Sequence, residues 1–201
     1  MSRIIFMEKA YSLLASNHLN LANDLNEKKD GFDTVHFDLT DNYFCETLGL
    51  SIITLEQLSL NTSFEIDVHL LVQRPNYILE RIKKLRVNSY TFHSETITHE
   101  EFNKIKFEKA KKGIALMPST NIKSLKNYLQ TADFVLLLCI TPSLFPSDDS
   151  INPVNRVKEF QEIFPQYNGG LVIDGGLEDE HLPELKNLNV EKVILGKKFF
   201  S

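Results

Sequence analysis

The sequence predicts an α/β protein with the fold of a (β/α)8 TIM barrel, short and lacking its final outer helix. Short β-branched or apolar runs recur eight times along the chain, and stretches with helical periodicity fill most of the intervals between them. Alternating strands and helices favour a parallel sheet, and eight repeats close more naturally into a barrel than into an open sheet. A doubly wound open sheet is the alternative that fits the same pattern.

The predicted strands begin near Ala10, Thr34, Phe64, Ser89, Gly113, Phe134, Gly170 and Lys192. The predicted helices cover residues 19–27, 51–58, 75–85, 100–111, 122–129, 153–164 and 182–188. Pro75 and Pro153 stand in the first turn of their helices, where a missing backbone N–H is tolerated. Every element therefore has a place in one repeating β–α order.

The stretch after the last strand is too short for an eighth outer helix, because only residues 196–201 follow Leu195. We therefore expect one flank of the barrel to be poorly covered, with Phe199 and Phe200 exposed. Either residues 4–7 fold over that flank, or a second subunit buries it in a symmetric homodimer.

Length and composition point to one domain, residues 1–201, with a small molecule as its partner. A hydrophobic content of 42% and a net charge of -5 are ordinary for a globular protein and give no electrostatic reason to expect nucleic acid or an anionic membrane. The N-terminal residues lack the apolar region of a signal peptide, and the longest apolar run, residues 134–140, is too short to span a bilayer. We expect a cytoplasmic protein whose Cys45 and Cys139 are reduced thiols.

Four side chains suited to metal binding close three of the predicted strands: His36, Asp38, His69 and Asp174. His36 and Asp38 are two residues apart on a strand, so both point to the same face. If the strands are parallel, their ends meet at one mouth, where two imidazoles and two carboxylates suit zinc, iron, manganese or cobalt. The alternative is that the histidines are packed in the core and that Asp174-Gly175-Gly176 is only a turn.

The same strand ends carry motifs in one order from Tyr11 to Phe200. They are Tyr11-Ser12-Leu13-Leu14, Val35-His36-Phe37-Asp38, Asp67-Val68-His69-Leu70, Met117-Pro118-Ser119-Thr120, Asp174-Gly175-Gly176 and Gly196-Lys197. In residue type and order the chain resembles the ribulose-phosphate 3-epimerase family over nearly its whole length. The two histidine motifs are the specific ones.

This resemblance implies a metal-dependent isomerase of carbohydrate metabolism, in the pentose phosphate pathway, acting on a sugar phosphate. By matching motif, the ligands of one divalent ion would be His36, Asp38, His69 and Asp174. Ser12 and His69 would also contact the substrate. The two aspartates would exchange acid and base roles at C3 of the sugar. The intermediate is an enediolate, whose developing charge a metal ion can neutralise.

One stretch departs from the family pattern. A glycine-rich loop whose amides approach the substrate phosphate is replaced by residues 141–149, which contain Pro146, Asp148 and Asp149 and no glycine. The remaining candidates for phosphate contact are Gly175, Gly176, Gly196 and Lys197. Methionines that cap the site in the family are replaced by Thr40, Leu71 and Leu138, so that Thr40 adds a hydroxyl to the pocket.

Two functions therefore stay open. One is a divergent epimerase of D-ribulose 5-phosphate or a close analogue such as a hexulose phosphate. The other is a catalytically weak, metal-bound paralogue that binds a sugar phosphate. The sequence also leaves two roles open near the site. Asp67 either orients His69 or has a solvent-facing or barrel-packing role, and His93 with Glu95 either lines the mouth or supplies supporting hydrogen bonds.

Overall fold

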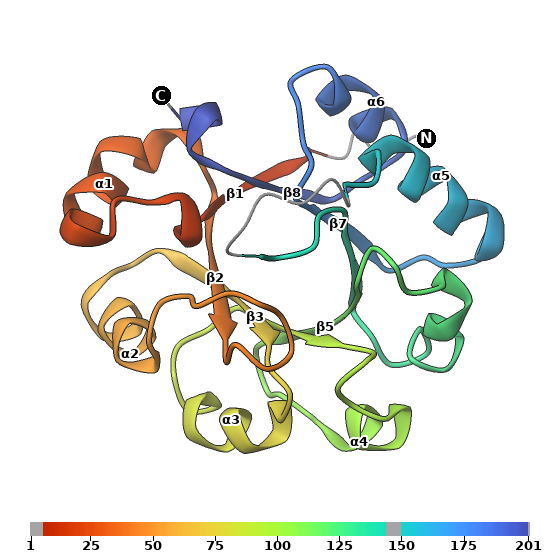
Figure 1. Ribbon diagram of the computed structural model, residues 1–201, viewed down its shortest axis with the longest axis horizontal. Helices are drawn as coiled ribbons and strands as arrows, with labels where there is room; N and C mark the ends of the chain where they lie inside the picture. Colours follow the sequence, from red (N-terminus) through yellow and green to blue (C-terminus); the bar gives the residue numbers. More distant parts are fainter. Residues whose placement is uncertain (1–5, 144–149, 201) are drawn as a thin grey trace.

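The computed structural model describes residues 6–143 and 150–200, and its strands form a closed, all-parallel barrel in chain order (Figure 1). The strands are β1 (Glu8–Ser12), β2 (Thr34–Thr40), β3 (Glu65–Leu71), β4 (Ser89–His93), β5 (Lys111–Leu116), β6 (Phe134–Leu138), β7 (Gly170–Asp174) and β8 (Lys192–Leu195). β8 pairs with β1, which closes the barrel and excludes the open sheet. The predicted fold class is confirmed.

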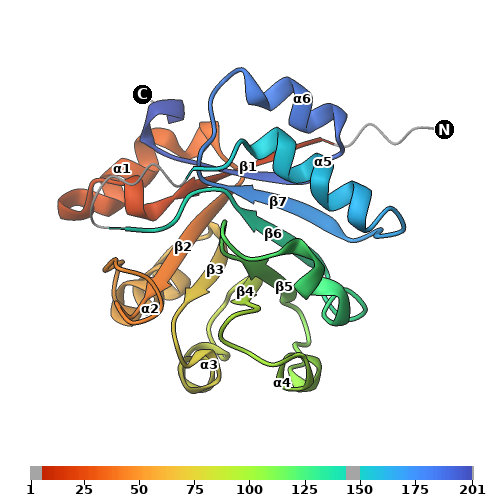
Figure 2. The ribbon, with the colours of Figure 1, turned by 45° about the vertical axis from the view of Figure 1, so that its right-hand side comes forward.

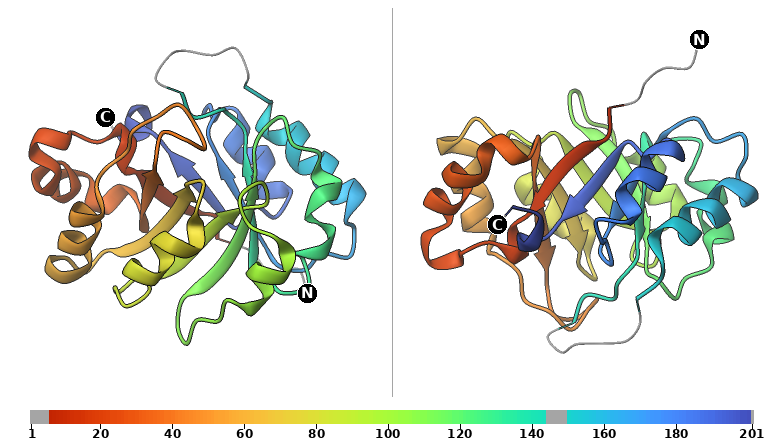
Figure 3. Two further views of the ribbon diagram at one scale, coloured as in Figure 1. Left: turned by 60° about the horizontal axis from the view of Figure 1, so that its bottom comes forward. Right: turned by 90° about the horizontal axis from the view of Figure 1, so that it is seen from above.

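The helices surround the barrel and cover the outer faces of its strands (Figures 2 and 3). They are α1 (Leu21–Lys28), α2 (Ile52–Asn61), α3 (Pro75–Ile82), α4 (His99–Lys104), α5 (Pro153–Ile163) and α6 (His181–Asn187). Short 3-10 helices complete the chain: η1 (Leu13–Ala15), η2 (His18–Asn20), η3 (Lys29–Gly31), η4 (Ile122–Asn127) and η5 (Lys197–Phe200). Local sequence fixes several helix starts: Pro75 and Pro153 occupy first turns, and Thr98 forms a capping box with Glu101.

Strand alternation divides the buried side chains into two layers. On β2, Val35, Phe37 and Leu39 pack outward into the large cluster shared with the helices. The alternate residues point inward, so that Thr34, His36 and Asp38 are buried polar groups inside the barrel. A second, smaller apolar cluster that includes residues of β5 to β8 also lies in the interior.

Two predicted helices are shorter or tighter than the sequence suggested. The helix expected over residues 100–111 ends at Lys104, and Lys111 is already the first residue of β5. Lys112 explains the early end, because its Nζ donates to the carbonyls of Phe102 at 2.8 Å and Ile105 at 3.1 Å. The stretch expected as a helix over residues 122–129 is the 3-10 helix η4, capped by Asn121.

The prediction that Phe199 and Phe200 are exposed is wrong. Both are partly buried against the main core, and the Phe200 ring lies 4.8 Å from the Tyr11 ring and 5.9 Å from the Phe32 ring, centroid to centroid. The short helix η5 turns these rings inward, so that they cover part of the flank that was expected to stay open for lack of a final outer helix.

The N-terminal stretch only partly follows expectation. Met7 packs against the main core, whereas Phe6 is 73% exposed, and Ile4 and Ile5 lie outside the described residues. Among the described helices, none is both long enough and apolar enough to cross a bilayer.

Candidate metal centre

The four predicted ligands meet at one end of the barrel interior. His36 and Asp38 lie on β2, His69 lies on β3 and Asp174 is the last residue of β7. In the parallel register Asp38 stands opposite His69, which places the two side chains side by side. Closure of the barrel brings Asp174 from the far side of the chain to the same point.

The distances between the four side chains are short. His36 Nε2 lies 3.2 Å from Asp38 Oδ1 and 3.6 Å from Asp174 Oδ2. His69 Nδ1 lies 3.1 Å and 3.5 Å from the same two oxygens. One ligand atom from each residue lies within 4.8 Å of all the others. The four atoms therefore surround a single point.

The residues fit a divalent cation. His36 is 1% exposed, and neither of its ring nitrogens has a hydrogen-bond partner among the described residues, although Nε2 faces two carboxylates within ion-pair distance. A buried nitrogen that lacks an aligned partner is costly unless another group satisfies it. Two imidazole nitrogens and two carboxylate oxygens form a donor set that holds divalent metals. The group could hold one metal ion.

Electrostatic coupling within the group is strong. Burial alone would raise the pKa of Asp38, but the neighbouring His36 and His69 outweigh that effect and hold its pKa below the ordinary value. Burial alone would lower the pKa of His69, but the hydrogen bonds and charges of Asp174 and Asp38 raise it to about 9. A cation that binds here would therefore displace a proton from His69.

The predicted substrate contacts gather at the same end of the barrel. Ser12 ends β1, and its Oγ donates to Asp38 Oδ2 at 3.4 Å. Gly175 and Gly176 follow β7 with φ values of 79° and 65°, and a Cβ on Gly175 would lie 2.2 Å from Ile140 Cγ2, so that this turn requires glycine. Gly196 follows β8.

Some predicted residues fall outside the described part of the chain. Lys197 begins η5, but its side chain is outside the described residues. Pro146, Asp148 and Asp149 also lie outside them. Thr40 is described, and its Oγ1 accepts from the backbone N–H of Gly49 at 2.6 Å, a contact that uses a lone pair and not the hydroxyl hydrogen.

The two open roles near the site are resolved differently by the geometry. Asp67 does not orient His69: it accepts from Ser89 Oγ and from Lys192 Nζ, both at 2.7 Å. His93 does supply a supporting contact, with its Nε2 2.9 Å from His69 Nε2. Beyond it, His93 Nδ1 lies 3.2 Å from Glu95 Oε2.

The pKa values of His93 and Glu95 are both shifted well below their ordinary values. Burial lowers the pKa of His93 to about 4. Burial would raise the pKa of Glu95, but hydrogen bonds from His93, Thr120 and the Met117 amide lower it to about 2. Sequence reasoning did not foresee the Phe44 ring, which packs 4.8 Å from the His93 ring. The sequence feature that could have indicated it is an aromatic residue a few positions after the strand that carries His36 and Asp38.

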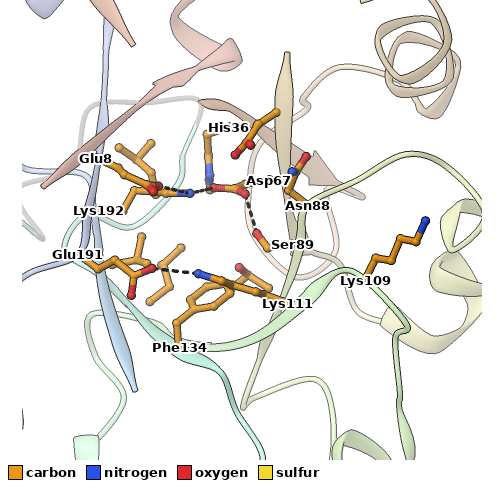
Figure 4. Close-up of a pocket in the computed structure, with 15 residues that line it drawn as sticks. Glu8, His36, Asp67, Asn88, Ser89, Lys109, Lys111, Phe134, Glu191 and Lys192 are labelled. Atoms are coloured by element: carbon orange, nitrogen blue, oxygen red, sulfur yellow. Dashed lines mark hydrogen bonds and ion pairs between the residues drawn. The ribbon is translucent and has the colours of Figure 1, made fainter. Parts of the chain in front are cut away.

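A cavity of about 270 Å³ lies toward the other end of the strands, and His36 of the four-residue group is among the residues that line it (Figure 4). Asp67 lies between Lys192 and Ser89, and Lys192 also pairs with Glu8 at 3.1 Å. Lys111 pairs with Glu191 at 3.1 Å, and its side chain is 60% exposed. The described charges in this cavity are largely paired with one another.

Comparison with known proteins agrees with this geometry. The family model of the ribulose-phosphate 3-epimerases matches residues 8–200. The ribulose-phosphate 3-epimerase of Helicobacter pylori is 27% identical over 198 residues, which cover 96% of this chain and 91% of that protein. The ribulose-phosphate 3-epimerase of Treponema pallidum is 27% identical over 175 residues, covering 85% of this chain and 80% of that protein.

Solved structures show the same fold at lower identity. The tryptophan synthase A-subunit of Pyrococcus furiosus has a TM-score of 0.66 at 15% identity, covering 98% of this chain and 89% of that one. An HpcH/HpaI aldolase from Desulfitobacterium hafniense has a TM-score of 0.68 at 9% identity, covering 94% of this chain and 86% of that one. At such identities the likeness supports the barrel and carries no argument about chemistry.

Proposed function

The chain belongs to the ribulose-phosphate 3-epimerase family, and from that premise we propose that it is a metal-dependent epimerase that inverts C3 of a ketose phosphate. The substrate would be D-ribulose 5-phosphate, converted to D-xylulose 5-phosphate, or a close analogue. One observation carries the proposal: carboxylates from β2 and β7 converge with two imidazoles on a single buried point. Residues 1–201 would act as a single domain.

Proton transfer is the part of the reaction that this chain's own residues perform. Epimerisation next to a ketone removes the C3 proton on one face and returns a proton on the other face. Asp38 and Asp174 project from different strands, so each carboxylate serves one face, and they exchange the roles of base and acid in the two directions. The lowered pKa of Asp38 keeps its carboxylate ionised.

The cation site uses the same residues. In this proposal His36, Asp38, His69 and Asp174 hold one divalent ion, which is zinc, iron, manganese or cobalt. When bound, the ion supplies positive charge that neutralises the oxygens of the enediolate. The carboxylates therefore do two jobs, since they hold the ion and move the proton.

Substrate would be bound by residues around this mouth. Ser12 and His69 flank Asp38 directly, with atoms at 3.4 Å and 3.1 Å from its carboxylate. Backbone N–H groups of Gly175, Gly176 and Gly196, with the charge of Lys197, would bind the phosphate. This phosphate site would take the place of the family's glycine-rich loop, since residues 141–149 contain no glycine.

A second function is favoured by that missing loop. Residues 141–149 contain no glycine, so a metal-bound protein that binds a sugar phosphate without efficient turnover is the competing proposal. The paired carboxylates favour the enzyme, because binding alone does not need proton acceptors on two faces.

Deuterium exchange separates the two functions. The metal-loaded protein is incubated with D-ribulose 5-phosphate in D2O, and NMR follows deuterium at C3 and the appearance of D-xylulose 5-phosphate. We expect both signals, and we expect neither with chelator-stripped protein. Binding of the sugar phosphate to metal-loaded protein without exchange, also for hexulose phosphates, would contradict the epimerase and support the binding paralogue.

The assembly and location expected from the sequence stay predictions. A homodimer is expected at micromolar concentration, where light scattering measures the mass of the particle. A monomer would contradict it and would fit the cover that Phe200 already provides on Tyr11 and Phe32. The cytoplasmic location is tested by cell fractionation.

A further inference from the structure

Two polar residues lie at and just after the end of β4, outside the four-residue group: His93 contacts His69, and Glu95 contacts His93. His93 is 0% exposed, and its ring plane is tilted by only 15° from that of His69. Its Nε2 lies 2.9 Å from His69 Nε2, and its Nδ1 lies 3.2 Å from Glu95 Oε2. A line of hydrogen bonds therefore runs from His69 through His93 to Glu95.

The facing nitrogens of the two rings restrict where protons can be. Two imidazole nitrogens 2.9 Å apart form a hydrogen bond only when one of them carries the proton and the other offers a lone pair. The other ring nitrogen of His69, Nδ1, faces Asp38 and Asp174. This nitrogen can bind a cation only if it carries no proton.

Glu95 selects between the two arrangements of protons. If His93 carried its single proton on Nε2, its bare Nδ1 would face the Glu95 carboxylate, and two acceptors would oppose each other. If His93 carries the proton on Nδ1, it donates to Glu95, and its bare Nε2 accepts from His69 Nε2–H. The second arrangement satisfies every contact in the line and leaves His69 Nδ1 open.

Glu95 is itself held in place as an acceptor. The backbone N–H of Met117 donates to its Oε1 at 2.7 Å, and the Thr120 hydroxyl donates to the same oxygen. The other oxygen, Oε2, faces His93. The carboxylate therefore has a fixed orientation, set by the segment that follows β5.

We propose that His93 and Glu95 are positioning residues that keep the proton of His69 on Nε2 and so keep its Nδ1 available to the divalent cation. The proposal rests on the cation site of the proposed function, but it does not depend on epimerisation. Partners of a metal-binding histidine that fix its proton contribute strongly to affinity. Neither residue needs to touch the substrate in this role.

Zinc affinity and the proton positions test the proposal. In Glu95→Gln, an amide that can donate or accept replaces the carboxylate, so His93 loses its preferred proton position. We expect the zinc Kd, measured by competition with a chromophoric chelator, to rise about 10- to 100-fold. The matched control Thr120→Val removes one hydrogen bond to Glu95 but keeps its charge, and its Kd is expected to stay close to that of the wild type.

Nitrogen-15 NMR of the zinc-loaded wild type reads the protons directly. We expect His93 to be protonated on Nδ1 and bare on Nε2, and His69 to be protonated on Nε2. This spectrum decides the proposal even if Glu95→Gln does not fold. His93 protonated on Nε2, or a folded Glu95→Gln variant with unchanged Kd, would overturn it.

The proposal and the proposed function fail in different ways. A wild type that binds no divalent cation would overturn the positioning role together with the metal part of the function. Zinc binding with the expected protons, but without deuterium exchange at C3, would support the positioning role and refute the epimerase.

Discussion

The two ends of the barrel interior both bury charged side chains, but they compensate the charge differently. At the N-terminal ends of the strands, Asp67 pairs with Lys192 at 2.7 Å, and the side chains are 8% and 13% exposed. At the C-terminal ends, Asp38 and Asp174 have only histidines as ion-pair partners among the described residues. The positive charge of a histidine depends on a proton that a metal ion can displace.

This difference distinguishes two ways of balancing buried charge. Asp67 and His69 are two residues apart on β3 and face the same interior, yet only His69 belongs to the convergent group. A carboxylate matched by a buried lysine needs no further partner. Two carboxylates that meet without a permanent positive charge, beside an unsatisfied histidine, form a group that could hold a cation.

The largest expected effect belongs to the C-terminal end. Asp174→Asn keeps the shape of the side chain but cannot carry a proton, so we expect deuterium exchange at C3 to fall by about 10²- to 10⁴-fold. The measurement is the exchange rate at saturating metal, with metal content determined in the same sample. Asp67→Asn makes the same chemical change at the other end and serves as the control, with exchange expected to remain.

An Asp174→Asn protein that retains its metal and full exchange would contradict the two-carboxylate mechanism. Loss of exchange in the Asp67→Asn control would contradict the separation of the two ends.

The next effect concerns stability at the N-terminal end. Lys192→Met removes the cation from a buried pair and leaves Asp67 uncompensated, so we expect the free energy of unfolding to fall by about 3 kcal/mol. Urea denaturation measures it, and zinc affinity is expected to stay unchanged. An unchanged stability would show that Lys192 is not needed to balance Asp67.

The difference in unfolding free energy between the wild type and Lys192→Met depends on pH with a definite sign. Burial alone would lower the pKa of Lys192, but Asp67 and Glu8 raise it above its ordinary value of 10.5. A raised pKa contributes stability that is complete below the ordinary value and is lost as the pH rises through the raised one. The difference between wild type and Lys192→Met is therefore expected to be constant from about pH 6 to 9 and to shrink only in strong alkali.

The smallest effect is expected for the outer partner of the same lysine. Glu8 lies 3.1 Å from Lys192, but its side chain is 40% exposed, so solvent screens the pair. Glu8→Gln is expected to lower stability by less than about 1 kcal/mol. A loss as large as that of Lys192→Met would show that Glu8, rather than Asp67, balances the lysine.

The barrel could be predicted because its signals are local. Apolar runs and helical periods repeat along the chain, and the alternation of side chains along a strand is enough to place His36 and Asp38 on one face. The end of α4 could not be predicted, because it depends on Lys112, which reaches back from β5 to the carbonyls of Phe102 and Ile105. The burial of Phe200 was missed for the same reason, since its partners Tyr11 and Phe32 are distant in sequence.

The residues of the candidate site could be predicted from the sequence, but the hydrogen-bond and ion-pair partners around them could not. The motifs indicate the four side chains that converge, whereas the role of Asp67 stays open in the sequence because alternation alone does not say which end of a strand a residue serves. Its partner Lys192 lies 125 positions away in sequence. The contact between His93 and His69 likewise depends on the register of β3 and β4, which local patterns do not determine.

Metal titration tests the central contrast between the two ends most directly. Chelator-treated wild type, Asp38→Asn and Asp67→Asn are titrated with zinc in a calorimeter. We expect one ion per chain for the wild type and for Asp67→Asn, and a large loss of affinity for Asp38→Asn. Absence of binding in the wild type, or equal binding in all three proteins, would contradict a cation site at the C-terminal end of the barrel.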